Sequence, residues 1–165
     1  MITLNNILVA TDFSEPSDAA LTYGRALARN FGAKLHVVHV VGSVPALVYG
    51  AEAYAASMPE LQQELEDSAR KQLAALLVDN DEQPMAVRPV VVTSNAPALA
   101  IVDYAARERI DLIVTGTQGR GGVAHLLMGS VAERVVRTAP CPVLTVRHPE
   151  HEFVLPDALV SVAKA

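Results

Sequence analysis

Residues 35–41 read Leu-His-Val-Val-His-Val-Val, a short and mostly apolar run that is rich in β-branched residues. Four more runs of this kind occur along the chain, at 7–10, 87–92, 112–114 and 143–146. Near-continuous apolar runs suit strands that are buried on both faces, as in a parallel sheet, whereas a sheet with one wet face alternates more cleanly. The sequence therefore predicts five buried strands.

Apolar residues recur at helical spacing between these runs, in patterns that lie within 21–31, 61–76, 98–109 and 131–139. Strand and helix thus alternate along the whole chain. Regular alternation requires crossover connections, which produce an α/β fold with a doubly wound parallel sheet and helices on both faces. The length of 165 residues fits one domain, since domains cluster near ~100–150 residues.

Local signals mark some of the helix ends. Ser14 predicts the N-cap of the first helix, and Asn95, with Pro97 two residues later, predicts the start of the third. Gly32 and Pro140 are stop signals.

Composition narrows the class of function. Thirteen basic and eighteen acidic residues give a net charge of −5, which argues against a partner that is duplex nucleic acid or an anionic membrane. The single cysteine, Cys141, excludes an internal disulfide and fits a reducing compartment. The N-terminus reads MITLNN, which lacks the features of a signal peptide, and no run approaches the roughly 18 apolar residues of a membrane span. We expect a cytoplasmic protein.

Glycine is concentrated in one segment that follows the fourth predicted strand. Five of the nine glycines lie within 116–129, at Gly116, Gly119, Gly121, Gly122 and Gly129. Backbone N–H groups in such a loop, with a helix N-terminus behind them, can cradle a phosphate. The alternative is a flexible surface loop.

Two common nucleotide motifs do not explain this loop. The chain contains no G-x-x-x-x-G-K-[S/T] sequence, so a Walker A site is excluded. The spacing Gly119-x-Gly121-x-x-Ala124 matches the loose dinucleotide pattern. However, that pattern belongs after the first strand and needs an acidic residue about 20 positions later, which is missing here.

The spacing Gly116-x2-Gly119-x9-Gly129-Ser130 is more specific. It is similar to the signature of the ATP-binding branch of the universal stress protein family. Residues 6–14 resemble the first strand of that family and its terminal Asp, and residues 129–144 resemble its last helix and strand. The resemblance spans 3–147, which predicts a nucleotide-binding domain over 1–147 and leaves 148–165 as a C-terminal tail.

The resemblance implies a Rossmann-like five-stranded sheet of order 3-2-1-4-5, with the first and fourth strands at its centre. Asp12 and the glycine-rich loop would then face each other across one crevice. It implies that the adenosine part of the nucleotide contacts Ala10, Thr11 and Asp12, and that Val40 lines the adenine slot. The residues that would hold the ribose and phosphates are Thr115, Gly116, Gly119, Arg120, Gly129, Ser130 and Val131.

The expected ligand is ATP, or ADP or AMP, with Mg²⁺ held by the phosphates rather than by the protein.

His36 and His39 lie three apart on a predicted strand and point to opposite faces, which makes them a poor metal pair. Ser130 is expected to cap a helix and contact phosphate, since no G-x-S-x-G elbow surrounds it.

The last strand, Pro142 to Val146, would form an apolar sheet edge, and its pairing with a second copy predicts a homodimer.

Three functions remain open. The favoured one is an ATP-binding module of the stress response that uses nucleotide occupancy as a switch and lacks robust catalysis, because no catalytic group is recognised beside the cradle. The second is a slow ATPase or nucleotidyl-transferring enzyme. The third is a nucleotide-free interaction or chaperone-like member of the same family. The long segment 42–58 is a possible lid or interface.

Overall fold

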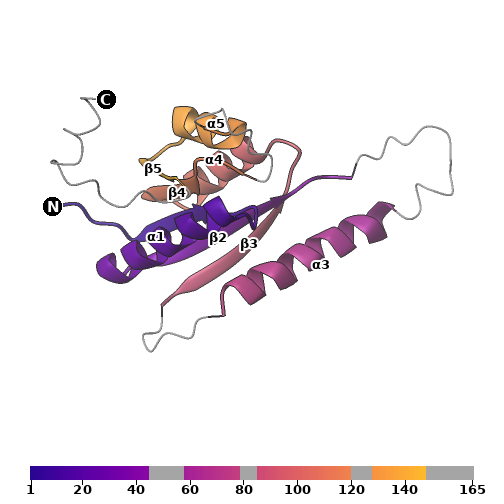
Figure 1. Ribbon diagram of the computed structural model, residues 1–165, viewed down its shortest axis with the longest axis horizontal. Coiled ribbons are helices and arrows are strands. Elements are labelled where there is room, and N and C mark those ends of the chain that lie inside the picture. Colours follow the sequence, from indigo (N-terminus) through magenta and orange to yellow (C-terminus); the bar gives the residue numbers. More distant parts are fainter. Residues whose placement is uncertain (45–57, 79–84, 120–127, 148–165) are drawn as a thin grey trace, which may run out of the picture.

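Five parallel strands form one sheet in the order β3-β2-β1-β4-β5. The computed structural model describes residues 1–44, 58–78, 85–119 and 128–147. The strands are β1 (Asn6–Ala10), β2 (Lys34–Val41), β3 (Val87–Thr93), β4 (Leu112–Gly116) and β5 (Val143–Val146). The helices in this part of the chain are α1 (Glu15–Phe31), α3 (Met58–Leu76), α4 (Pro97–Arg107) and α5 (Ser130–Thr138), as Figure 1 shows. The predicted fold class and strand order are confirmed.

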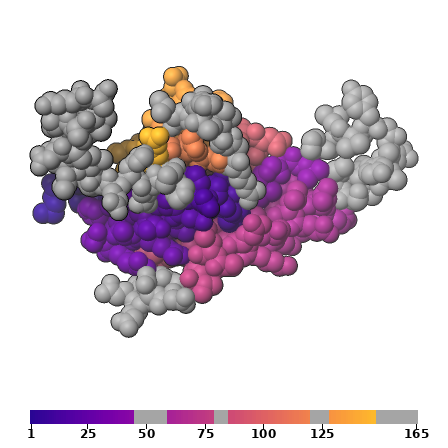
Figure 2. Space-filling model, in the orientation of Figure 1, coloured from indigo at the N-terminus to yellow at the C-terminus, as the bar shows by residue number. Residues whose placement is uncertain are grey.

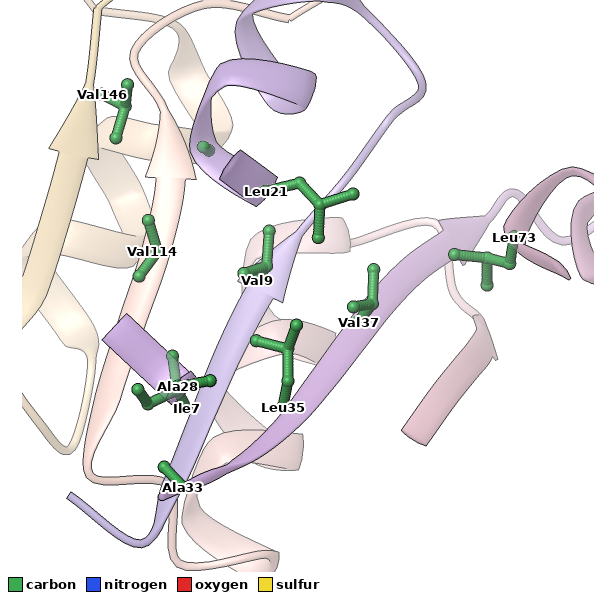
Figure 3. Close-up of a cluster of buried hydrophobic side chains, with 11 residues drawn as sticks. Ile7, Val9, Leu21, Ala28, Ala33, Leu35, Val37, Leu73, Val114 and Val146 are labelled. Atoms are coloured by element: carbon green, nitrogen blue, oxygen red, sulfur yellow. The ribbon is translucent and has the colours of Figure 1, made fainter. Parts of the chain in front are cut away.

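The sheet is covered on both faces, so the middle residues of its central strands are buried. The prediction of five buried strands is wrong for the two edge strands: β3 has no buried residue and β5 has one, because each edge strand has a neighbouring strand on one side only. Ile7 and Val9 of β1 pack toward α1, and Leu8 between them packs toward α4 and α5; all three are 0% exposed. Figure 3 shows the hydrophobic cluster around Ile7 and Val9, to which α1 and α3 contribute side chains on the same face of the sheet. In the space-filling view, α1 (indigo) and α3 (magenta) accordingly lie next to each other (Figure 2). This two-sided burial is the reason that the strands read as unbroken apolar runs.

Helix α1 begins and ends where the sequence predicts. Ser14 is its N-cap, and the Ser14 backbone N–H donates to Ser17 Oγ at 3.1 Å. The helix ends at Gly32, whose φ of +64° lies in the left-handed region that glycine adopts without a steric penalty. In the middle of the helix, a Cβ on Gly24 would lie 2.2 Å from Val9 Cγ2. The absence of a side chain at position 24 therefore lets α1 approach β1 closely.

The predicted start of α4 is displaced by one residue. Ala96, and not Asn95, is the N-cap. Asn95 Oδ1 instead accepts a hydrogen bond from the Ser43 backbone N–H at 2.8 Å. The amide side chain is therefore engaged by the segment after β2, a long-range partner that local sequence does not reveal.

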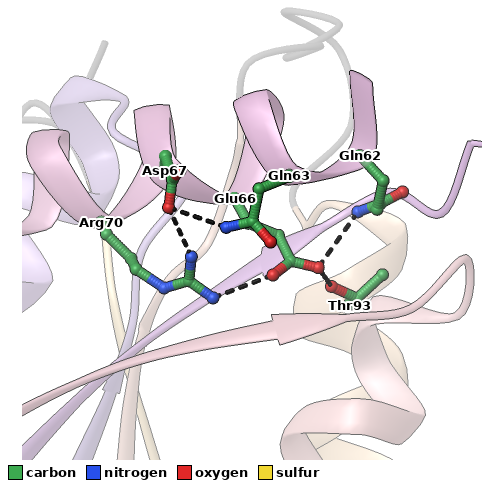
Figure 4. Close-up of polar contacts among 6 residues, drawn as sticks. All are labelled: Gln62, Gln63, Glu66, Asp67, Arg70 and Thr93. Carbon is green, nitrogen blue, oxygen red and sulfur yellow. Dashed lines mark hydrogen bonds and ion pairs between the residues drawn. The ribbon is translucent and has the colours of Figure 1, made fainter. Parts of the chain in front are cut away.

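Helix α3 is only partly packed on the sheet. Ala69 and Leu73 are buried, whereas Leu61 and Leu65, in the same predicted stripe, are 44% and 42% exposed. A polar network links this end of the helix to the sheet edge: Thr93 Oγ1 donates to Glu66 Oε1 at 2.7 Å, and Arg70 binds Glu66 (Figure 4). The hydrogen bond from Thr93, followed by that from Arg70, lowers the pKa of the Glu66 carboxyl.

One polar pair lies inside the core. His36 Nδ1 and Tyr104 Oη are 2.8 Å apart, and the two residues are 1% and 4% exposed. This pair joins β2 to α4. His36 is thus a packed core histidine. Within the described residues, no helix combines the length and the apolar character that a membrane crossing requires.

Candidate functional site

A cavity of about 470 Å³ opens at the carboxyl ends of the central strands. It lies where the chain connections leave β1 and β4 in opposite directions, which is the point at which ligands bind in open α/β sheets. The residues that line it come from the ends of β1, β2 and β4 and from the first turns of α1, α4 and α5. A volume of this size suits a small organic ligand.

Ten of the eleven predicted site residues line this cavity, namely Ala10, Thr11, Asp12, Val40, Thr115, Gly116, Gly119, Gly129, Ser130 and Val131. Arg120, the eleventh, lies outside the described residues, as do most of segment 42–58 and the tail 148–165. The sequence analysis did not single out eight further lining residues as site residues: Ser17, Val38, His39, Pro97, Ile101, Thr117, Gln118 and Ala132. Val38 carried a usable signal, because residues two apart on a strand share a face and Val40 was already assigned. Thr117 and Gln118 carried one as well, because they lie between the assigned Gly116 and Gly119.

The turn after β1 is fixed by a closed set of hydrogen bonds. The Phe13 N–H donates to Thr11 Oγ1 at 3.0 Å, and Ser17 Oγ donates to the Ser14 carbonyl at 2.8 Å. With the Ser17 proton used in this way, the 3.1 Å contact between the two hydroxyls is a donation from Thr11 Oγ1 to Ser17 Oγ. Thr11 and Ser17 are both buried, so each hydroxyl is satisfied inside the protein.

Asp12 lies in the middle of this turn. Ser14 donates to Asp12 Oδ1 both from its hydroxyl and from its backbone N–H. The second oxygen faces the glycine-rich loop, because a Cβ on Gly119 would lie 2.6 Å from Asp12 Oδ2. The structure thus brings Asp12 and this loop together across one crevice, from positions more than a hundred residues apart.

Another part of the cavity wall is the start of α5. Gly129 is the N-cap, with φ −72° and ψ 153°, and its N–H donates to the Thr117 carbonyl at 2.7 Å. Ser130 was expected to be the cap, but it is the first helical residue and is exposed. The first-turn N–H groups of a helix lack intrahelical acceptors and carry the positive end of its dipole. This wall of the cavity therefore favours an anion.

The carboxylate of Asp12, which also lines the cavity, has the opposite preference. A phosphate placed against this carboxylate would be repelled, whereas hydroxyl or amino groups could donate to it. The lining thus combines a carboxylate that favours hydrogen-bond donors with a helix N-terminus, at Gly129, that favours an anion. Within the described ranges, no group of three or more His, Cys, Asp or Glu is arranged to hold a metal ion.

These features define the chain as an α/β protein with a ligand crevice at the switch point of a doubly wound sheet. A model of the universal stress protein family matches residues 3–147, and the chain belongs to that family. It is 34% identical over 146 residues to a universal stress protein of Methanocaldococcus jannaschii, covering 88% of this chain and 84% of the relative.

Solved structures agree with this assignment. The universal stress protein UspA of Lactobacillus plantarum superposes with a TM-score of 0.69 at 27% identity, over 89% of this chain and 100% of that protein. A universal stress protein solved in complex with cAMP has a TM-score of 0.56 at 24% identity, over 88% of this chain and 98% of that protein. At that level of identity, the second likeness shows a common fold.

Proposed function

We propose that this protein binds an adenine nucleotide, ATP or its products ADP and AMP, and acts as a nucleotide-dependent module of the stress response without robust catalysis. The observation that carries the proposal is that Asp12 and the N-terminus of α5 behind Gly129 line the same cavity. A nucleotide matches this combination, because its sugar and base offer hydrogen-bond donors while its phosphates are anionic.

Each part of the nucleotide has a matching surface. Val38, Val40 and Ile101 provide apolar lining for the adenine ring. Asp12, with Ala10 and Thr11 beside it, faces the adenosine part. The ribose and phosphates would be held by Thr115, Gly116, Gly119, Gly129, Ser130 and Val131, with the phosphates against the N-terminus of α5. Arg120 belongs to the same proposed set. Mg²⁺ would be held by the phosphates and water, its usual manner of binding beside nucleotides.

A relative supports the choice of ligand class. The family member solved with cAMP shares this fold, so a sheet of this topology accommodates an adenine nucleotide in at least that protein. The cytoplasm, where adenine nucleotides are abundant, is the location that we propose for this chain.

We further propose a homodimer through β5, because the two edges of the sheet differ. Edge strand β3 carries Pro89 in its middle, which removes one backbone donor, and its Arg88 forms an ion pair with Glu108 at 2.7 Å. Edge strand β5 has the sequence Val-Leu-Thr-Val and no such interruption. Val136 of the neighbouring helix α5 is 45% exposed and would gain cover from a second copy.

The test compares Gly129→Asp with Gly129→Asn. A Cβ at this position would come no closer than 3.5 Å to its nearest protein atoms, and both residues are good N-caps, so neither variant should disturb the fold. The two side chains have nearly the same size, so their comparison isolates the negative charge. Single charges about 4 Å apart repel by about 1–4 kcal/mol near a protein surface, which corresponds to roughly 5- to 1,000-fold in affinity.

Calorimetry measures the affinity of each variant for ATP and for adenosine. We expect ATP to bind Gly129→Asp at least fivefold more weakly than Gly129→Asn, and adenosine to bind the two variants alike. Equal losses for both ligands would contradict the proposed orientation. Purified wild-type protein that releases no nucleotide on heating and binds none would favour the nucleotide-free alternative. Sustained ADP production that Gly129→Asp abolishes would favour the slow ATPase.

A further inference from the structure

His39 contacts the chain on both sides of Asp12. Its ring nitrogen Nδ1 lies 2.8 Å from the Thr11 carbonyl oxygen. A carbonyl only accepts, so Nδ1 carries the proton and donates it. On the other side, the His39 ring packs against the Phe13 ring with their centroids 4.3 Å apart at an angle of 36°. One side chain of β2 therefore holds both neighbours of the carboxylate that faces the cavity.

The conformation that His39 holds is an unusual one. Phe13 has a φ of +63°, a region that bulky residues rarely adopt and that persists where the surroundings enforce it. Its backbone N–H donates to Thr11 Oγ1, and the next N–H, that of Ser14, donates to Ser17 Oγ and Asp12 Oδ1. The positive φ occurs directly after Asp12, in the turn that connects β1 to α1.

The hydrogen bond to Thr11 acts directly on Asp12. The Thr11 carbonyl and the Asp12 nitrogen belong to the same planar peptide unit. A hydrogen bond that holds this oxygen therefore also fixes the orientation of the backbone at the Asp12 nitrogen. The Thr11 N–H is held as well, by the Val38 carbonyl at 2.9 Å. Both partners lie on β2, at neighbouring positions of the strand beside β1.

We infer that His39 is a positioning residue for nucleotide binding. Its Nδ1–H group sets the Thr11–Asp12 peptide, and its ring supports Phe13, so that Asp12 is oriented before the nucleotide arrives. This inference rests on the proposed function for its consequence in binding, but the orientation of the turn is a property of the protein alone. A pre-oriented carboxylate spares the ligand the cost of ordering it, which raises affinity.

Two variants separate the hydrogen bond from the packing. His39→Asn places an amide donor near the position of Nδ1 but removes the ring. His39→Leu keeps an apolar side chain against Phe13 but removes the donor. Urea denaturation of both variants shows that each is folded and gives its stability, so that a general loss of structure is not mistaken for an effect on the turn.

The first measurement needs no nucleotide. It is the rate of amide hydrogen exchange at Phe13 and Ser14, with Leu8 and Val9 of β1 as internal references. A hydrogen bond of ordinary net strength corresponds to a change of about 3- to 10-fold. We expect His39→Leu to accelerate exchange at Phe13 and Ser14 by about this factor relative to the references, and His39→Asn, which keeps a donor but lacks the ring, to accelerate it less. Unchanged exchange in His39→Leu would overturn the inference.

The second measurement is ATP affinity by calorimetry. We expect a loss of about 3- to 10-fold in His39→Leu and recovery in His39→Asn. If His39→Asn is as defective as His39→Leu, a donor at this position does not restore binding and the assigned role of the Nδ1–H group is wrong. If exchange changes while ATP affinity does not, the positioning role is wrong although the proposed function stands. If wild-type protein binds no ATP, the proposed function fails and the exchange rates alone decide whether His39 orients the turn.

Discussion

The buried pair of His36 and Tyr104 should make the stability of this protein fall on acidification. Burial, followed by the positive charges of Lys34 and Arg88, lowers the pKa of the His36 imidazole; Glu108 acts weakly in the opposite direction. The folded state therefore keeps this ring neutral down to a lower pH than the unfolded chain does. The unfolded chain takes up a proton once the pH falls below the ordinary value of 6.5, so the stabilising effect is present above that pH and is lost below it.

The size of the effect follows from linkage. If the folded state binds no proton at His36, the free energy of unfolding falls by about 1.4 kcal/mol between about pH 7.5 and 5.5, which is the upper limit for one histidine of ordinary unfolded pKa. Other groups titrate over the same range, so the measurement needs a reference chain that lacks only this pair. His36→Leu combined with Tyr104→Phe removes both polar groups and keeps similar volumes.

The assay is urea denaturation of both proteins at the two pH values. At the higher pH we expect each single variant to lose about 1–3 kcal/mol, because each leaves a buried polar group unpaired, and the double variant to lose less than the sum. At the lower pH we expect wild type to lose up to ~1.4 kcal/mol more than the double variant. Parallel losses in the two proteins would refute the reasoning.

Two further predictions concern packing and surface charge. Gly24→Ala should destabilise the protein by about 1–3 kcal/mol, because the new methyl would lie 2.2 Å from Val9 Cγ2; in the same denaturation experiment Gly42→Ala, whose Cβ would have no neighbour closer than 3.7 Å, should change little. Thr93→Val should raise the pKa of Glu66 toward its ordinary value, because the Thr93 hydroxyl is the main cause of the lowered pKa. An NMR titration of the Glu66 carboxyl tests this, and an unchanged titration curve would contradict the assignment.

Much of the fold could be predicted because its determinants are local. A strand buried on both faces has to be apolar at every position, as Ile7, Leu8 and Val9 are. Ser14 and Gly32 act within a few residues of the helix ends that they mark. The strand order was less accessible, since the pattern alone leaves it open and only the family resemblance implied it.

The candidate site likewise has a part that the sequence predicted and a part that it did not. In a parallel sheet all strands end at one edge, so residues after strands, such as Asp12 and Gly116, were predictable as neighbours. Side-chain contacts between elements that are distant in the sequence could not be predicted. Asn95 reaches Ser43 instead of capping α4, and Leu61 and Leu65 extend past the sheet that their spacing predicts they pack on.

The amino-acid sequence by itself determined five strands, the helices between them and the glycine-rich segment after the fourth strand, because each follows from periodicity or from a short motif. Only the tertiary structure decided that His39 holds Thr11 and Phe13, that Tyr104 pairs with His36 and that Gly119 closes on Asp12. These contacts join residues 26 to 107 positions apart. No local pattern encodes such contacts, since they depend on where the packed elements bring each side chain.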